Sequence, residues 1–306
     1  MVKSLTEKKC LITVVGPTAI GKTAMAIELA KYFNCEIISA DSRQFFKEMT
    51  IGTAVPDKEE LAAAKHHFIQ NISIKDNYTV GDFERDAVNK LEELYANNNF
   101  TVLVGGSGLY IDAVLKGFDD FPEVSPEIRQ KLVTQYELQG ISYLQEELKQ
   151  RDPEHYENVA KENPQRLMRA LEVCIASGKP YSSFLNIKKN SRQFTPIAIG
   201  LMAERQLMYD RINERVDIMI ANGLIEEAKA LYPYKNLNAL QTVGYRELFN
   251  HFDGEYTLDF AVEEIKKNTR RFAKRQMTWF KRNDAVQWFD FKIPPQEIIN
   301  YIKGSL

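Results

Sequence analysis

Eight residues near the start of the chain have the types and the spacing of a phosphate-binding loop. Residues 16–23 read Gly-Pro-Thr-Ala-Ile-Gly-Lys-Thr, which fits the pattern G-x-x-x-x-G-K-T. In such a loop successive backbone N–H groups wrap phosphate oxygens, the lysine adds a positive charge, and the threonine hydroxyl can hold Mg²⁺. We therefore expect a diphosphate or triphosphate to bind to Gly16, Pro17, Thr18, Ala19, Ile20, Gly21, Lys22 and Thr23, with Mg²⁺ as a cofactor on Thr23.

Three further charged side chains are candidates for chemistry beside that loop. Asp41 follows the short apolar stretch 36–40, and ligands of open α/β sheets bind beyond the carboxyl ends of the strands. Asp41 is then either a cap of the following turn or a catalytic acid or base. Arg211 and Arg215 are four residues apart, so they project from one face of a helix. They either clamp a diphosphate or pair with acidic neighbours at the surface.

A basic segment near the C-terminus has the composition of a nucleic-acid contact. Residues 266–282 contain eight Lys and Arg and no acid, although the net charge of the whole chain is only −2. Such runs are more often solvated faces, but a basic helix that also carries aromatic side chains can hold a phosphate backbone. A polyanion is the favoured partner. The expected inner face of this helix is Ile265, Thr269, Phe272, Gln276 and Phe280.

The elements that position these residues follow from the hydrophobic pattern. Short apolar runs predict buried parallel strands, and apolar positions at three-and-four spacing predict helices that face a core. Strand, glycine loop and helix follow one another at the start of the chain, so we expect an α/β fold with a P-loop NTPase-like parallel sheet flanked by helices. The expected strands are 10–15, 36–40, 100–104 and 196–201, the helices are 24–33, 59–65, 78–95 and 205–222, and a closing strand and helix fall within 291–306.

The middle of the chain changes to helical patterns alone. We expect a helical insertion domain at 121–190, between a first part of the core at 1–120 and a second part at 191–306. The last helix of the middle region can equally be a crossover of the core. The expected helices are 126–139, 141–151, 153–160 and 164–177.

Other features restrict the class of function. The strand 100–104 ends in Gly-Gly-Ser-Gly and lacks the acidic residue typical of a phosphohydrolase, which disfavours an ATPase without excluding a kinase. The pair His66-His67 does not predict a metal site, because adjacent side chains point in different directions. No apolar run approaches the roughly twenty residues of a membrane span, and residues 1–9 lack the apolar stretch of a signal peptide. We therefore expect a cytoplasmic protein without a membrane partner.

Taken together, the motifs resemble those of the tRNA dimethylallyltransferases, the bacterial tRNA isopentenyltransferase family. Ser107 stands where threonine is usual, Ile20 occupies a variable position of the loop, and the given chain carries no Cys/His zinc finger like that of eukaryotic relatives. The resemblance spans residue 10 to about residue 288. The matching segments, in family order, are 16–23, 38–44, 49–54, 103–110, 163–166, 169–172, 243–246 and 273–279.

The resemblance implies a reaction and a set of roles. A dimethylallyl group would pass from dimethylallyl diphosphate to the N6 amine of the adenosine beside the anticodon, in tRNAs that read codons beginning with U. Asp41 would be the general base, and Lys22, Thr23 and Arg215 would act on the diphosphate, with Arg211 a weaker candidate. The residues facing tRNA would be Asp41, Ser42, Arg43, Gln44, Ser107, Arg129, Gln165, Arg166, Leu167, Met168, Arg169, Gln241, Thr242, Val243, Gly244, Tyr245 and Arg246, joined by Lys274 and Arg275 of the basic segment. We expect a monomer.

Two alternatives belong to other classes. A P-loop small-molecule or nucleoside kinase that uses ATP and Mg²⁺ would explain the loop, Asp41 and a helical lid, but it would not explain the basic segment. A non-catalytic RNA-binding module would use the loop only to hold a phosphate backbone.

Overall fold

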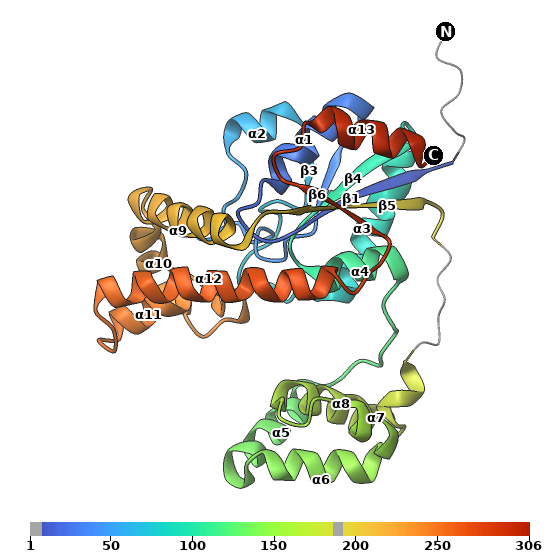
Figure 1. The fold of residues 1–306 in the computed structure, drawn as a ribbon. Coiled ribbons are helices and arrows are strands. Elements are labelled where there is room, and N and C mark those ends of the chain that lie inside the picture. The colour runs from blue at the N-terminus through green and yellow to red at the C-terminus, as the bar shows by residue number, and fades with distance from the viewer. Residues whose placement is uncertain (1–7, 186–191) are drawn as a thin grey trace. The chain divides into compact units, whose positions relative to one another are not determined.

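The computed structural model describes residues 8–185 and 192–306, and it divides the chain into two compact units. The first unit consists of Met1–Leu115 and Arg192–Leu306, and the second is Lys116–Ser191 (Figure 1). The first expected border, after residue 120, falls a few residues beyond the one observed. The second expected border, after residue 190, lies outside the described residues, as does most of the segment 1–9.

A parallel sheet of six strands is the centre of the first unit, which confirms the α/β class. Its strand order is β3-β2-β4-β1-β5-β6, and every neighbouring pair is parallel. The residues of β1 and β4 are all buried, as is typical of strands covered on both faces. The strands are β1 Cys10–Val15, β2 Ile37–Ser39, β3 His66–His67, β4 Phe100–Val104, β5 Thr195–Met202 and β6 Val286–Asp290.

Helices cover both faces of this sheet (Figure 1). On one face α1 (Lys22–Phe33) and α13 (Pro295–Gly304) share a hydrophobic core with β1, β4 and β5. On the other face α3 (Val80–Tyr95) and α4 (Gly108–Lys116) pack against the same strands. The short helix α2 (Lys58–Ala63) contacts α1. The sheet is therefore held between two apolar layers, and the ends of its strands are left to form a site.

The C-terminal helices of the first unit form a third apolar cluster around Tyr245, Leu240 and Leu248. The longest of them, α12, contacts both α9 and α11. The expected closing strand is wrong in its position, because β6 precedes residue 291 and buries only Val286 fully. The elements are α9 Arg205–Ala221, α10 Leu224–Leu231, η2 Tyr232–Tyr234, η3 Asn238–Leu240, α11 Tyr245–Phe252 and α12 Leu258–Phe280.

The inner face of α12 differs from the expected one at one position. Ile265, Gln276 and Phe280 are buried, as expected, but Phe272 is 38% exposed and Ala273 is buried in its place. The helix is turned so that Phe272 lies on the flank of the buried stripe. Among the described residues no helix is both long enough and apolar enough to cross a membrane.

The second unit is a bundle of helices with its own core. Leu144, Leu148, Leu167 and Leu171 are fully buried at its centre. The helix that the sequence assigned to either unit, α8, contacts α5 and α6 and so belongs here. Its helices start and end where the sequence predicts, except that α7 ends earlier, at Asn158. They are α5 Pro126–Gln139, α6 Ile141–Arg151, α7 Pro153–Asn158, α8 Pro164–Ser177 and the short η1 Tyr181–Phe184.

Because β2 and β4 approach closely at their carboxyl ends, we predict that a side chain at position 105 destabilises the protein. A Cβ atom on Gly105 would lie 2.5 Å from the carbonyl carbon and oxygen of Ala40, which are backbone atoms that cannot turn away. G105A should lower the free energy of unfolding by about 1–3 kcal/mol, measured by urea denaturation. The matched control is G304A at the end of α13, where a Cβ would meet nothing within 4 Å. Equal stability of the two variants would contradict this packing.

Candidate functional site

A pocket of about 990 Å³ opens at the carboxyl ends of β1, β2 and β4, and all of its lining residues belong to the first unit. Its walls come from the phosphate loop, the segments after β2 and β4, the helices α9 and α12, and the start of α11. The expected site residues that the structure brings together here are Thr18, Ala19, Gly21, Lys22, Thr23, Asp41, Ser42, Arg43, Gln44, Ser107, Arg211, Arg215, Gln241, Thr242, Val243, Gly244, Arg246 and Arg275.

The phosphate loop is anchored from behind and open in front. The side chain of Ile20 is buried in the core shared with α1, and a Cβ on Gly16 would lie 2.5 Å from the carbonyl oxygen of Leu201 on β5. Gly21 has φ 103° and leads directly into α1, a conformation that favours glycine. The first turn of α1 contains no acid, so the partial positive charge of the helix start faces the pocket without compensation.

Lys22 is half-buried and lies in the lining of the pocket. Its Nζ atom donates to the carbonyl oxygen of Pro17 at 2.8 Å. Burial lowers the pKa of Lys22 to about 8; the carboxylate of Asp41 opposes that effect, and the guanidinium of Arg215 adds to it. Burial likewise lowers the pKa of Arg215, again against the influence of Asp41. Two partly desolvated cations therefore lie close together near Asp41, and Glu60 also acts on Arg215; a bound anion would offset the cost of their desolvation.

The two arginines of α9 have different surroundings. The Nε atom of Arg211 donates to the carbonyl oxygen of Ala19 at 3.0 Å, and its guanidinium lies 4.9 Å from the ring centre of Phe291. Both arginines line the pocket; Arg211 is bonded to the phosphate loop, and Arg215 is close enough to Lys22 to affect its pKa. This arrangement favours a role at an anion site over the surface pairing that the sequence left open.

Asp41 caps the following turn, one of the two roles that its position suggested. Its Oδ1 atom accepts the backbone N–H of Arg43 at 3.2 Å, and its carbonyl oxygen accepts the N–H of Gln44 at 3.0 Å, so it closes a turn. The other oxygen, Oδ2, lies on the side of Gly106, 3.8 Å from where a Cβ of that glycine would be. One carboxylate oxygen is thus used by the turn, and the other is directed toward the wall formed by the end of β4.

The residues after Asp41 build the wall of the pocket. The N–H of Ser42 donates to Oγ of Ser107 at 3.0 Å, which ties the end of β2 to the end of β4. The Nε2 atom of Gln44 donates to the carbonyl oxygens of Thr53 and Ala54 at 3.2 and 2.9 Å. Arg43 donates from Nη1 to the carbonyl oxygens of Asn238 and Ala239 at 2.9 Å each. These contacts hold three separate segments in register around the opening.

Glu227 supports this wall from behind, and the sequence analysis missed it. Its carboxylate accepts the backbone N–H groups of Thr50, Ile51 and Gly52 at 3.0, 2.8 and 2.9 Å, and the hydroxyl of Tyr245 at 2.7 Å. Glu227 lies on α10, and its partners are far from it in the sequence. The motifs that contain Gly52 and Tyr245 were visible, but no local pattern indicates the acid that joins them.

Three residues expected to face tRNA have buried side chains, and those expectations are wrong. Tyr245 is fully buried beside Gly52 and Glu227, and Leu167 and Met168 belong to the core of the second unit. The reason is helical periodicity. A range such as 165–169 covers more than one turn of α8, so it includes residues on the inner face as well as polar residues on the outer one.

The outer face of α8 carries a polar cluster within the second unit. Arg129 donates from Nη1 to Oε1 of Glu172 at 2.6 Å and from Nη2 to Oε1 of Gln165 at 2.7 Å. Arg169 lies 3.4 Å from the other oxygen of Glu172 and 5.4 Å from the ring centre of Phe121. Because Glu172 is buried while both arginines are about half-exposed, it orders two guanidinium groups at the surface.

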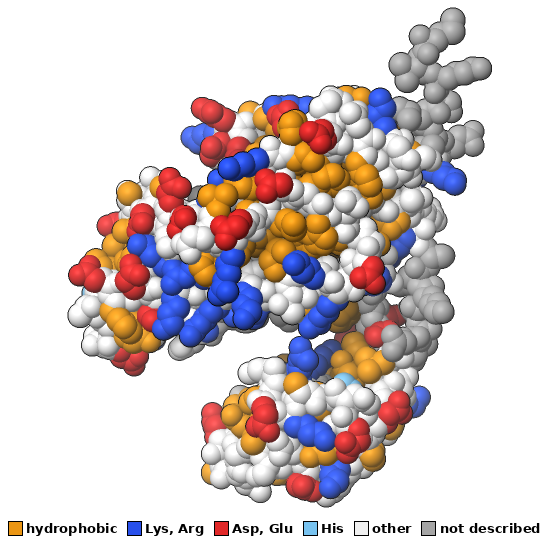
Figure 2. Space-filling view, viewed as in Figure 1, with side chains coloured by type: hydrophobic (Ala, Val, Ile, Leu, Met, Phe, Trp, Pro, Cys, Tyr) orange, Lys and Arg blue, Asp and Glu red, His pale blue; other side chains and the backbone are white. Residues whose placement is uncertain are grey.

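The basic segment is only partly free of acids. Lys266 pairs with Asp217 at 2.8 Å, and Lys267 pairs with Glu264 at 2.7 Å, so acids outside residues 266–282 neutralise its beginning. The cations nearer the end of α12 include Lys274 and Arg275. Figure 2 shows Lys and Arg side chains gathered over α12. Aromatic rings support two of these cations: Arg275 lies 5.6 Å from the ring centre of Phe272, and Arg282 lies 5.5 Å from that of Trp279.

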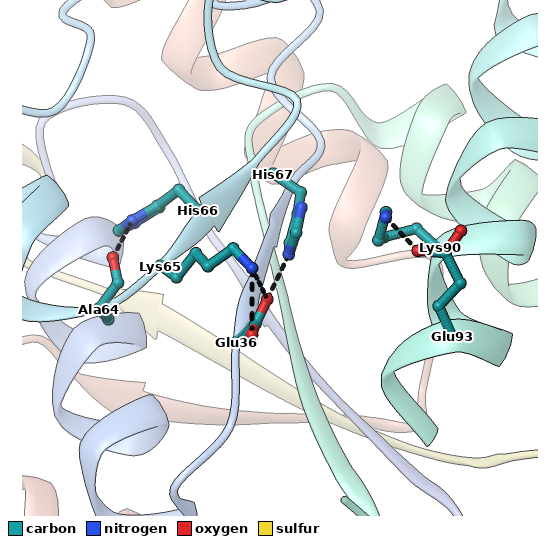
Figure 3. Close-up of polar contacts among 7 residues, drawn as sticks. All are labelled: Glu36, Ala64, Lys65, His66, His67, Lys90 and Glu93. Atoms are coloured by element: carbon teal, nitrogen blue, oxygen red, sulfur yellow. Dashed lines mark hydrogen bonds and ion pairs between the residues drawn. The ribbon is translucent and has the colours of Figure 1, made fainter. Parts of the chain in front are cut away.

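His66 and His67 at the edge of the sheet form no metal site (Figure 3). Nε2 of His67 is 2.5 Å from Oε2 of Glu36, Lys65 is 3.2 Å from the same oxygen, and Nδ1 of His66 contacts the carbonyl oxygen of Ala64. Burial alone would raise the pKa of Glu36, but hydrogen bonds from His67 and Lys65 outweigh it and lower that pKa. In residues 8–185 and 192–306 no three His, Cys, Asp or Glu lie together in a way that could hold a metal.

The strand, loop and helix, with a lysine and a carboxylate at the same sheet edge, define an α/β protein of the phosphate-loop class. Comparisons with known proteins narrow this class. A model of the family described as IPP transferase matches residues 44–283. A tRNA dimethylallyltransferase of Flavobacterium johnsoniae is 65% identical over 304 residues, covering 97% of this chain and 98% of that protein. The chain belongs to the IPP transferase family.

Solved structures agree with this assignment. A full-length tRNA isopentenylpyrophosphate transferase of Bacillus halodurans is 36% identical, with a TM-score of 0.71, and the match covers 97% of this chain and 96% of that one. A eukaryotic dimethylallyltransferase acting on tRNA is 25% identical, with a TM-score of 0.78, and the match covers 92% of this chain and 74% of that one. The fold is therefore similar in proteins that share 25–36% of their residues with this chain.

The lowered pKa of Lys22 predicts how anion binding depends on pH. An anion in the pocket favours the ammonium form, so binding must take up a proton once the free lysine is neutral. The affinity for inorganic pyrophosphate, measured by calorimetry, should hold below pH 8 and fall by up to about tenfold per pH unit above it. K22M removes this group and controls for the titration of the ligand itself. The same pH dependence in K22M would show that Lys22 is not the titrating group.

Proposed function

We propose that the protein transfers a dimethylallyl group from dimethylallyl diphosphate to the N6 amine of the adenosine adjacent to the anticodon in tRNA, and releases diphosphate. The observation that carries this proposal is the convergence of the phosphate loop, Arg215 and Asp41 in one pocket. The relatives support it, since they are named tRNA dimethylallyltransferase and tRNA isopentenylpyrophosphate transferase. In the reaction the bond from the allylic carbon to oxygen breaks, and a bond from that carbon to nitrogen forms.

The leaving diphosphate would bind where the positive charge is concentrated. The start of α1, Lys22 and Arg215 together neutralise charge that develops on the departing oxygen, which lowers the energy of the transition state. The same cations would bind the diphosphate before reaction, because burial disfavours their charged forms until an anion enters. The loop therefore serves a carbon–oxygen cleavage here, and no phosphoryl group is transferred.

The residues of the loop fit Mg²⁺. Thr23 lies in the first turn of α1 and lines the pocket, and its hydroxyl is the kind of oxygen ligand that Mg²⁺ accepts together with substrate phosphates and water. Mg²⁺ bound there would neutralise part of the diphosphate charge. Thr23 is the protein ligand that we assign to it.

The acceptor amine needs a base because its lone pair is delocalised into the adenine ring. Asp41 is suited to take the proton as the carbon–nitrogen bond forms. One of its oxygens is fixed by the N–H of Arg43, so the carboxylate has a defined orientation. Ser42, Gln44 and Ser107 shape the space in front of it, where an adenosine that has left its stack would enter. A base of a single-stranded loop is more easily extruded than a base of a duplex.

The RNA itself would be held by cations from both units. In the first unit these are Arg246, Lys274 and Arg275, and in the second they are Arg129, Arg166 and Arg169. Contacts of this kind bind the phosphate backbone and position the anticodon loop without reading its sequence. A kinase would share the loop and Asp41, but no observation in the structure favours it over prenyl transfer.

The function is tested by incubating the protein with Mg²⁺, dimethylallyl diphosphate and an unmodified tRNA transcript, and by measuring the mass of the RNA. A parallel incubation uses γ-labelled ATP with nucleosides. We expect a mass increase of one dimethylallyl group on the RNA and no labelled phosphate product. Labelled product without prenylated RNA would support the kinase instead.

The proposed role of Asp41 as the base predicts how its replacement changes the rate of prenyl transfer. D41N keeps an oxygen that can accept the N–H of Arg43 but removes the base, so the single-turnover rate should fall by about 10²–10⁴-fold. The affinity for tRNA should stay unchanged in a filter-binding assay. E214Q is the matched control, because Glu214 is another carboxylate in the lining of the pocket. Equal rates for D41N and the native protein would exclude Asp41 as the base.

The basic end of α12 makes a prediction about salt. If Lys274 and Arg275 each contact a phosphate, K274A and R275A together should reduce the dependence of log K on log salt concentration by about two units of slope. K303A, a similar loss of charge on the exposed end of α13, is the control and should leave the slope unchanged. An unaltered slope in the double variant would show that Lys274 and Arg275 face solvent and do not contact the RNA.

A further inference from the structure

Gln276 of α12 joins two loops that the proposed reaction needs at a fixed distance. Its Oε1 atom accepts the backbone N–H of Thr18 in the phosphate loop at 2.9 Å. Its Nε2 atom donates to the carbonyl oxygen of Gly106, just after β4, at 3.0 Å. The side chain is 5% exposed, so both hydrogen bonds are shielded from water and would be costly to leave unmade.

The two loops carry opposite ends of the site. The phosphate loop follows β1 and holds the leaving group, whereas Gly106 follows β4 and lies beside the Oδ2 atom of Asp41. A Cβ atom on Gly106 would overlap the amide nitrogen of Gln276, so only glycine leaves room for this contact. The amide group therefore occupies the gap between the loop that binds diphosphate and the carboxylate on the acceptor side.

The helix that carries Gln276 is itself anchored. One turn further on, Nε1 of Trp279 donates to Oδ2 of Asp112 on α4 at 2.9 Å, and Phe280 is buried in the core of the sheet. Trp279 lies directly against Gly108, where a Cβ would overlap the indole ring. The amide of Gln276 is thus mounted on a rigid element and is not free to follow either loop.

The chemistry makes this distance important. Displacement at an allylic carbon requires the amine and the departing oxygen to be aligned through that carbon, with reacting atoms about 3–3.5 Å apart, and a 1 Å error costs on the order of 10²-fold in rate. The amide of Gln276 accepts from Thr18 with its oxygen and donates to Gly106 with its nitrogen. We propose that Gln276 is a positioning residue that sets the separation between the phosphate loop and the Asp41 side of the pocket. This inference rests on the proposed function.

The test compares Q276M and Q276E with the native protein in single-turnover prenylation of an anticodon stem-loop, with enzyme in excess. Q276M keeps the length of the side chain and loses both hydrogen bonds, and Q276E keeps an acceptor for Thr18 but loses the donor to Gly106. We expect rate constants about 10- to 100-fold lower, with the same final fraction of RNA modified and unchanged tRNA affinity. The matched control is Q296M, the same replacement at an exposed glutamine of α13.

The rate constant and the fraction of active enzyme separate positioning from folding. A purely structural role would lower the active fraction, measured by titrating the enzyme with excess stem-loop, while the single-turnover rate constant at saturating enzyme stayed native; that result would overturn the inference, as would native behaviour of both variants. Should Q276M fail to fold, Q276E alone decides by the same criterion. Failure of the native protein to prenylate the RNA would instead reject the proposed function, so the two failures are distinguishable.

Discussion

The rest of the site depends on the desolvation of two positively charged side chains, Lys22 and Arg215, in the lining of the pocket. Lys22 and Arg215 lose water, and their pKa values fall because of it, yet Asp41 is the nearby carboxylate that opposes the shift for both. Such an arrangement is unfavourable in the empty protein and becomes favourable when a polyanion enters. In the proposed reaction, desolvation would prepare the loop for a diphosphate, and the lower dielectric constant would strengthen each contact to the departing group.

The parallel sheet explains how distant segments reach this place. β1, β2 and β4 are neighbours, and all end at the same edge; the loop, Asp41 and Ser107 follow those three ends. Glycines make the convergence possible where Gly105 lies against Ala40 and Gly106 lies against Gln276. The absence of an acidic residue after β4 thus has a physical reason: two side chains of α12 fill the space in front of that loop.

The loop, the main strands and most helices could be predicted because their signals are local. The phosphate loop is a contiguous motif, and β4 is a contiguous apolar run. Contacts between distant segments could not be predicted. The sequence around Glu227 does not indicate that this residue binds the backbone of Gly52. The sequence around Lys266 does not reveal its ion pair either, because the partner, Asp217, lies on another helix. The role of Gln276 was partly visible in the sequence, because the helical periodicity places this polar residue on the buried face of α12.

The separate core of the helical insertion has a consequence for how the protein melts. Leu144 and Leu171 pack among neighbours of their own unit, so heat can disrupt that bundle without exposing the sheet. Unfolding then proceeds in stages, and a single transition temperature does not describe the molecule. It also means that substitutions can accumulate in the core of the bundle without altering the packing of the sheet.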